Sequence, residues 1–188
     1  MPVNPKALIS EGIACARAGA SVVHIHVYDP ATGLQFEDFD AYRAVIEGIR
    51  EVEDVIVYPT LPLSGFEKTG QTHSPEARFK TVKKLAAAGL LEWSVIDPGT
   101  TQINELDPRG ADGIRFLYIN SEAEIRYGLE LASQYKFVPS FAIYEPGFLR
   151  LGAHLSAMTH ECPRPIYRFM FSDKFSFGFP AKEIYLSA

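Results

Sequence analysis

Hydrophobic and polar positions divide the chain into two alternating kinds of segment. Longer segments of helix-forming residues, with apolar positions recurring every three or four residues, predict helices over residues 5–18, 39–52, 75–88, 121–135 and 148–158. Shorter apolar runs rich in β-branched and aromatic residues predict six strands, near Val22, Val55, Val95, Phe116, Phe141 and Phe169. Since one helix or one loop of crossover length separates each strand from the next, the pattern predicts an α/β protein with a parallel sheet.

Two architectures are consistent with this alternation. A doubly wound sheet usually carries a glycine-rich phosphate turn after its first strand, and the sequence contains neither GxGxxG nor GxxxxGKS. A TIM barrel instead places polar site residues at the carboxyl ends of its strands. Such residues follow the predicted strands here, namely His24, His26, Asp29, Thr60, Asp97, Asn120, Glu145 and Asp173. We therefore favour one TIM-barrel domain over residues 1–188, incomplete because about six βα units are present where the fold has eight.

Composition and charge narrow the class of protein. The 188 residues carry a net charge of −5 without a basic stripe, so a nucleic-acid-binding surface is not expected. The N-terminus lacks the apolar core of a signal peptide, and no apolar run approaches the roughly 20 residues of a membrane helix. The two cysteines lie far apart and match no zinc-ribbon or CxxC spacing. We expect a soluble, cytoplasmic protein that acts on small molecules.

The stretch "SVVHIHVYDP" places two histidines in an otherwise apolar strand. Residues two apart in a strand point to the same side, so His24 and His26 face one way, about 7 Å apart along the strand. That spacing lets two imidazoles share one metal ion at ~2.0–2.1 Å per bond, with a carboxylate and an open position completing the shell. The alternative stays open that they are core histidines bonded to hydroxyls, or exposed polar residues.

Four further residues are candidates for chemistry or binding. Thr60 in "YPTLPLSG" offers a hydroxyl and Asp97 in "VIDPGT" a carboxylate, and we assign both to catalysis. Glu145 in "YEPG" and Asn120 are assigned to substrate binding. Each has a structural alternative, because threonine between prolines and the Asp-Pro-Gly sequence are also common turn chemistry.

Five stretches together resemble the β-keto acid cleavage enzymes: "GASVVHIHVYDPATG", "YPTLPLSG", "EWSVIDPGT", "SFAIYEPGFLRLG" and "YRFMFSDKFSFGFP". The similarity runs along nearly the whole chain, and the family's "VHIHVRDP" signature differs only at Tyr28, where arginine is usual. The resemblance implies a TIM barrel, a zinc ion held by His24, His26 and a glutamate of the eighth strand, and homo-oligomers such as the tetramers of relatives. It also implies a reaction in which a 3-keto acid and acetyl-CoA give acetoacetate and a new acyl-CoA.

Measured against this family pattern, we expect the chain to begin after the first barrel strand and to end after the seventh, without the zinc glutamate and the acid–base groups beside it. An alternative function is therefore a catalytically inactive, truncated barrel that serves as an oligomerising or regulatory subunit. A third possibility is another TIM-barrel metal enzyme, an aldolase or an amidohydrolase. Ser140 and Ala142 stand where some relatives carry glutamates thought to meet an amino group, so we do not expect an amino-bearing substrate.

Overall fold

Helices and strands alternate along the part of the chain that the structure, a computed structural model, describes: residues 4–62, 74–106 and 113–185. The helices are α1 (Pro5–Arg17), α2 (Phe39–Arg50), α3 (Pro75–Arg78), α4 (Lys80–Ala87), α5 (Glu122–Tyr135) and α6 (Pro146–Met158), followed by a short 3-10 helix, η1 (Glu183–Tyr185). The strands are β1 (Val22–Ile25), β2 (Ile56–Pro59), β3 (Trp93–Val95), β4 (Thr101–Asn104), β5 (Arg115–Tyr118), β6 (Val138–Ile143) and β7 (Ile166–Phe169).

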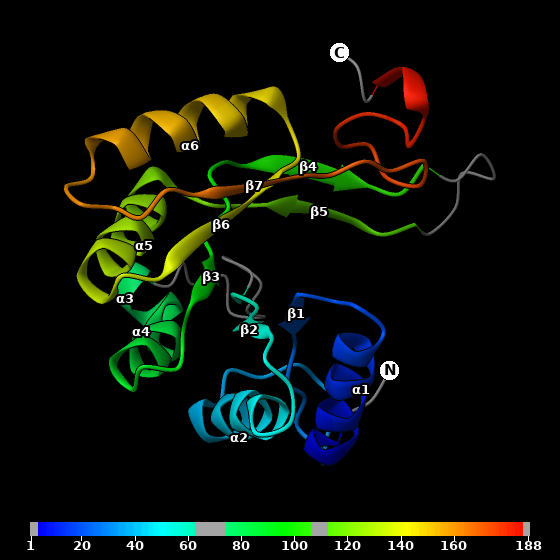
Figure 1. The fold of residues 1–188 in the computed structure, drawn as a ribbon. Coiled ribbons are helices and arrows are strands. Elements are labelled where there is room, and N and C mark those ends of the chain that lie inside the picture. The colour runs from blue at the N-terminus through cyan, green and yellow to red at the C-terminus, as the bar shows by residue number, and fades with distance from the viewer. Residues whose placement is uncertain (1–3, 63–73, 107–112, 186–188) are drawn as a thin grey trace.

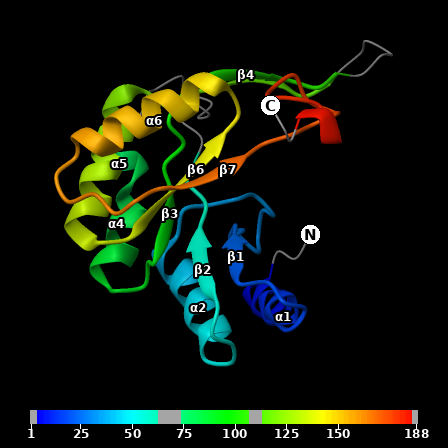
Figure 2. The same cartoon turned by 45° about the horizontal axis from the view of Figure 1, so that its top comes forward.

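Five of these strands run parallel, as the alternation of helices and strands predicts. β1 pairs with β2, and β3 pairs with β6, which pairs with β7. β2 packs beside β3, so the strands form a curved row in the order β1, β2, β3, β6, β7. The helices α1, α2, α4, α5 and α6 lie outside this row, each packed against the next (Figures 1 and 2). The predicted α/β class is confirmed.

A closed barrel is not seen among the described residues. Hydrogen bonds join the parallel strands into two separate sheets, β1–β2 and β3–β6–β7, and within the described ranges no hydrogen-bonded ladder connects β2 to β3. The structure therefore shows a curved α/β arrangement, while the incomplete TIM barrel that the sequence predicts is not confirmed.

The strand predicted near Phe116 is present as β5, but its parallel placement was wrong. β5 pairs antiparallel with β4, which lies in a segment predicted to be a loop, and Ile103 stands opposite Phe116. A parallel pair needs a crossover of a dozen or more residues, usually helical, whereas two antiparallel strands can be joined directly. Only ten positions without a helical pattern separate Asn104 from Arg115, so the chain makes a hairpin and β3 pairs with β6 instead.

Helix ends follow the chemistry of their boundary residues. Ser121 and Glu124 form a capping box at the start of α5, in which each side chain accepts a hydrogen bond from the other residue's backbone N–H. Gly19 and Gly89 take left-handed φ angles of 105° and 72° after α1 and α4, which ends each helix and turns the chain into the next strand.

The helix predicted over residues 75–88 is instead two helices, α3 and α4, which meet at Phe79 with φ −90° and ψ 9°. Arg78 and Phe79 are adjacent in sequence and both are buried. The ψ angle of Phe79 lies outside the helical range, which ends α3 and lets α4 begin at the next residue.

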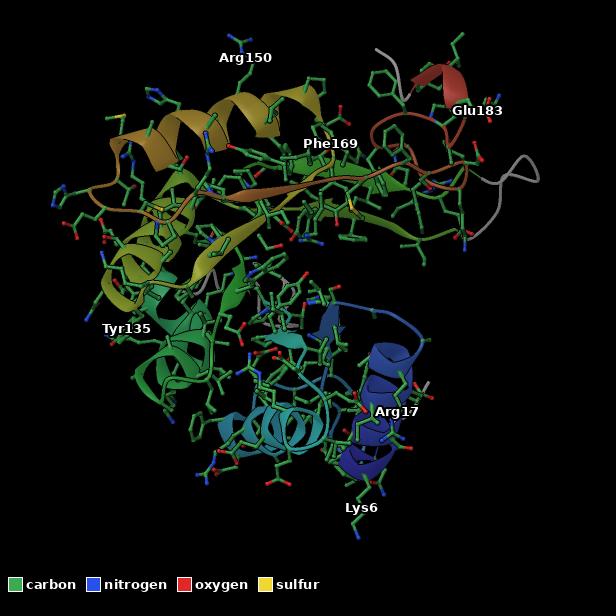
Figure 3. The ribbon with its side chains drawn as sticks, viewed as in Figure 1. Lys6, Arg17, Tyr135, Arg150, Phe169 and Glu183 are labelled. Carbon is green, nitrogen blue, oxygen red and sulfur yellow. The ribbon has the colours of Figure 1, made fainter. Side chains whose placement is uncertain are left out.

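Exposed polar side chains mark the outer surface of the helices. Figure 3 shows Lys6 of α1 and Arg150 of α6 projecting away from the protein, whereas Tyr42, Val45, Ile46 and Ile49 of α2 are fully buried. No helix in the described ranges has the length and apolar character needed to span a bilayer.

Because the five strands β1, β2, β3, β6 and β7 run parallel, their carboxyl ends lie at the same edge of the row. The candidate site lies at this edge.

Candidate active site

An open pocket of about 210 Å³ lies at the carboxyl ends of the parallel strands. Its polar lining comes from six strands or the residues just after them: His24, His26, Thr60, Asp97, Tyr118, Tyr144 and Arg168. Apolar side chains of the β4–β5 hairpin, Ile103 and Phe116, complete one wall. This is the end of a parallel α/β fold at which binding sites form, because the strands converge there and their following loops stay open to ligands.

His24 and His26 lie side by side in this pocket. Their ring centroids are 5.0 Å apart at an interplanar angle of 80°, and the His24 ring lies 4.5 Å from that of Tyr58 on the neighbouring strand. Parallel pairing of β1 and β2 sets Tyr58 opposite His24. The spacing of two along the strand therefore brings both imidazoles into one space, as same-face alternation requires.

The His24 imidazole is neutral at pH 7. Burial of the ring lowers its pKa from 6.5 to about 4, and His26 and Arg168 add electrostatic repulsion against a second positive charge. Part of the side chain reaches solvent at the pocket opening, but the atoms around the ring still disfavour its protonated form. A neutral imidazole keeps the lone pair that a metal ion requires.

Asp97 lines the same pocket as the histidines and is contacted by three polar groups. The Tyr118 hydroxyl donates to its Oδ2 at 2.6 Å, the Ala142 backbone N–H donates to its Oδ1 at 2.7 Å, and Arg168 Nη2 lies 3.7 Å from Oδ1. Burial raises the pKa of Asp97, and these three partners oppose that rise. Burial and the adjacent Asp97 raise the pKa of Tyr118 well above its usual value, so Tyr118 keeps its proton and acts as a donor.

Arg168 supplies the positive charge of the pocket. Its Nε donates to Ser140 Oγ at 2.8 Å while Nη2 faces Asp97, which fixes the plane of the guanidinium. A guanidinium has more donor hydrogens than these contacts use, so it can also bind an anion. Arg168, Tyr118 and Tyr144 were not predicted as site residues from the sequence. A charged residue inside the apolar run "IYRFMF" was a usable signal for Arg168, whereas nothing distinguished the tyrosines from packing aromatics.

The structure brings four of the six sequence-predicted site residues together and leaves two outside. His24, His26, Thr60 and Asp97 line the pocket. Thr60 is buried, and its backbone N–H donates to the Ile25 carbonyl at 2.9 Å, which sets its position just after β2.

Asn120 and Glu145 are engaged elsewhere. Asn120 Oδ1 accepts from Arg78 Nη2 at 2.8 Å and its Nδ2 donates to the Gly99 carbonyl, so this side chain connects the end of α3 to the loop after β3. Glu145 Oε1 accepts from the Gly178 N–H at 3.4 Å, beside a separate apolar groove of about 120 Å³.

The two imidazoles suit zinc in type and spacing, but they make only part of a zinc site. Catalytic zinc takes three protein ligands and keeps one position open. Among residues 4–62, 74–106 and 113–185, no group of three or more histidine, cysteine, aspartate or glutamate side chains is placed to hold a metal ion. Asp97, the carboxylate of the pocket, is already bonded to Tyr118 and Ala142.

The fold and the pocket define a parallel α/β protein with paired imidazoles, a guanidinium and a buried carboxylate at its strand ends. The chain belongs to the beta-keto acid cleavage enzyme family, whose model matches residues 1–188. It is 41% identical over 76 residues to a 3-dehydrocarnitine:acetyl-CoA trimethylamine transferase of Rhizobium meliloti (strain 1021), and this match covers 40% of the chain and 25% of that protein.

A solved structure has a similar fold. It is the ternary complex of ObcA with a C4-CoA adduct and oxalate, with a TM-score of 0.65 and 17% sequence identity over 91% of this chain and 37% of that chain. At this identity the likeness shows the fold alone. The chain thus spans about a quarter of the curated relative and about a third of this solved structure.

Proposed function

We propose that this protein is a zinc-dependent β-keto acid cleavage enzyme built on part of a TIM barrel. In the proposed reaction a 3-keto acid and acetyl-CoA give acetoacetate and a new acyl-CoA. Membership of the family and the acetyl-CoA-dependent name of the relative support this chemistry. The observation that carries the proposal is one pocket that joins two imidazoles, His24 and His26, to the guanidinium of Arg168.

The reaction balances without an oxidant or a reductant. The bond between C2 and C3 of the keto acid breaks, and its CH2–carboxylate unit joins the acetyl group to give acetoacetate. The carbon–sulfur bond of acetyl-CoA also breaks, and the remaining acyl group of the keto acid joins the coenzyme A sulfur that the acetyl group leaves. The enzyme must therefore hold a carboxylate, polarise a ketone and stabilise the negative charge that develops as the carbon–carbon bond breaks.

Arg168 binds the carboxylate of the keto acid in this proposal. Ser140 and Asp97 hold its guanidinium in one orientation, so little side-chain freedom is lost when a substrate binds. Asp97 acts here by holding Arg168 and Tyr118 in place. Thr60 donates its hydroxyl to the charge that develops on the substrate oxygen, which hydrogen-bond donors in a partly closed site stabilise strongly. Asn120 and Glu145 make no substrate contact in this scheme.

His24 and His26 would hold the zinc ion, with a third ligand from outside the described residues. Their fit rests on donor type, on the 5.0 Å between ring centroids and on the neutral state of His24. When bound, zinc acts as a Lewis acid that polarises the ketone and stabilises an enolate. Following the resemblance, we also propose that the protein works in the cytoplasm as a homo-oligomer.

Isotope-traced turnover and metal content test the proposal together. Purified protein is given zinc, a panel of 3-keto acids and acetyl-CoA labelled with carbon-13 in the acetyl group. Mass spectrometry is expected to find the label in acetoacetate and an unlabelled new acyl-CoA. Elemental analysis is expected to find zinc in the wild type and none in the double variant His24→Ala/His26→Ala, which loses turnover. The matched control is His160→Ala, whose side chain is 94% exposed.

Two results would count against the proposal. Equal zinc content and turnover in the double variant would remove the histidines from the site. A correctly assembled wild type without zinc and without turnover on any 3-keto acid would favour the inactive-subunit alternative. A separate variant, Arg168→Met, is expected to raise KM for the keto acid by roughly 10- to 100-fold while KM for acetyl-CoA stays within about twofold, because one charge-assisted contact is lost.

A further inference from the structure

The chain after β1 folds back on itself and brings a second polar pair next to the histidines. Tyr28 forms an antiparallel bridge with Gln35, and the Phe36 N–H donates to the Val27 carbonyl. Asp29 closes the turn between them, since its Oδ1 accepts from the Ala31 N–H at 2.8 Å. Residues after the turn therefore run antiparallel to the end of the histidine strand.

This register places Gln35 and Glu37 on the same side of the hairpin as His26. Side chains two apart in an extended segment share a face, and residues directly opposite across an antiparallel pair share it too. With Tyr28 opposite Gln35, the same register sets His26 opposite Glu37. The sequence pattern H-x-H-x-Y is thus matched across the turn by Q-x-E.

The side chains make a relay of hydrogen bonds. Gln35 Oε1 lies 2.8 Å from His26 Nδ1, and the Gln35 side chain also hydrogen-bonds the Glu37 carboxyl group. Above a pH of about 7 the Glu37 carboxyl group is ionised and can only accept, so the Gln35 NH2 group then faces Glu37. The amide oxygen then faces His26, which must donate from Nδ1. A neutral ring that carries its proton on Nδ1 has its lone pair on Nε2.

We propose that Glu37 and Gln35 are positioning residues that hold His26 in its Nδ1–H tautomer. In this tautomer the lone pair of Nε2 is available to bind a metal ion in the pocket. The tautomer itself follows from the relay, and only its use as a metal ligand rests on the proposed function. Partners of this kind commonly fix the orientation and tautomer of ligand histidines.

The burial of Glu37 supports this role. Within the described part of the chain, its Oε1 is buried and has no hydrogen-bond partner, although burying such an atom is costly. Burial raises the pKa of Glu37 to about 7, and the Gln35 hydrogen bond acts in the opposite direction. A costly carboxylate that is kept beside a pocket histidine is more easily explained by a positioning role than by stability.

Nitrogen-15 NMR of the histidine rings tests the tautomer directly in metal-free protein at pH 8.5, where Glu37 is ionised. In the wild type, Nδ1 of His26 is expected to be the protonated nitrogen. Glu37→Gln removes the constraint on the amide and is expected to give a mixture of tautomers, and Gln35→Leu is expected to give the Nε2–H form that free imidazole prefers. Glu130→Gln, at an exposed position of α5, is the matched control and leaves the spectrum unchanged.

A swap of the two groups provides a rescue. The double variant Gln35→Glu/Glu37→Gln puts a carboxylate beside His26 and an amide behind it, which again requires a donor at Nδ1. It is expected to restore the Nδ1–H tautomer, whereas a merely structural role would leave the double variant as perturbed as either single one. An Nε2–H tautomer in the wild type, or a tautomer unchanged by Glu37→Gln, would overturn the proposal.

Zinc affinity separates this inference from the proposed function. A competition titration with a chelator is expected to show binding weakened by roughly 10- to 100-fold in Gln35→Leu and Glu37→Gln. Wild-type protein that binds no zinc but shows the Nδ1–H tautomer would support the relay and overturn the metal site. Zinc binding that is equally tight in wild type and both variants would overturn the relay's link to the metal.

Discussion

Glu37 makes the stability of the protein depend on pH in a direction opposite to that of most carboxylates. Burial raises the pKa of its carboxyl group to about 7, against 4.5 when the group is free in solution. Between these two values the folded protein holds a proton that the unfolded chain has released. The free energy of unfolding therefore falls as pH rises from about 4.5 to about 7 and changes no further from this group above that range.

The size of the effect follows from the gap of about 2.5 between the two pKa values. Each pKa unit corresponds to about 1.4 kcal/mol, so Glu37 accounts for a loss of at most about 3 kcal/mol in the free energy of unfolding between pH 4.5 and 8. Glu37→Gln keeps the shape of the side chain and removes the titration. The variant is thus expected to gain stability relative to the wild type by ~2–3 kcal/mol as pH rises across this range.

Urea unfolding measures this difference at pH 5, 6, 7 and 8 in wild type and Glu37→Gln, with the slope m compared to confirm that both unfold in the same way. Glu130→Gln, exposed on α5, serves as the control and is expected to follow the wild type within about 0.5 kcal/mol at every pH. A difference between Glu37→Gln and wild type that stays constant from pH 5 to pH 8 would refute the reasoning, because it would mean that Glu37 titrates alike in both states.

Two further pairs of variants test the packing around the site by urea unfolding. Gly152→Ala is expected to destabilise by ~1–3 kcal/mol because its Cβ would lie 2.7 Å from the ring of Phe141, whereas Gly147→Ala, with open space around it, changes stability by less than about 0.5 kcal/mol. Arg78→Met is expected to cost ~3–5 kcal/mol because it removes the buried positive charge that pairs with Glu124, whose carboxylate keeps its hydrogen bonds to Ser121, while Arg126→Met removes an exposed pair and costs at most about 0.5 kcal/mol. Equal costs within either pair would contradict the packing described here.

The sequence predicted what depends on local alternation. His24 and His26 share a face because they are two apart in a strand, and Ser121 starts α5 because its hydroxyl and Glu124 bond to each other's backbone N–H. The antiparallel hairpin was missed because the mostly polar residues of β4, Thr101–Asn104, do not have the apolar pattern of a strand and were interpreted as loop, which left β5 without its neighbouring partner. Gln35 was missed although Asp29 and Gly33 signal the turn that brings it back.

Distant contacts also decide what Asp97 does. Its position after β3 predicts a catalytic carboxylate, but its oxygens accept from Tyr118 at the end of β5 and from Ala142 on β6, and they lie near Arg168 on β7. Three elements far apart in sequence are thus tied to one buried group. Because Tyr118 belongs to the hairpin, this bond fixes a structure outside the parallel sheets as a wall of the pocket. The hairpin is therefore part of the site, and its hold on the pocket depends on a hydrogen bond that no pattern within either segment predicts.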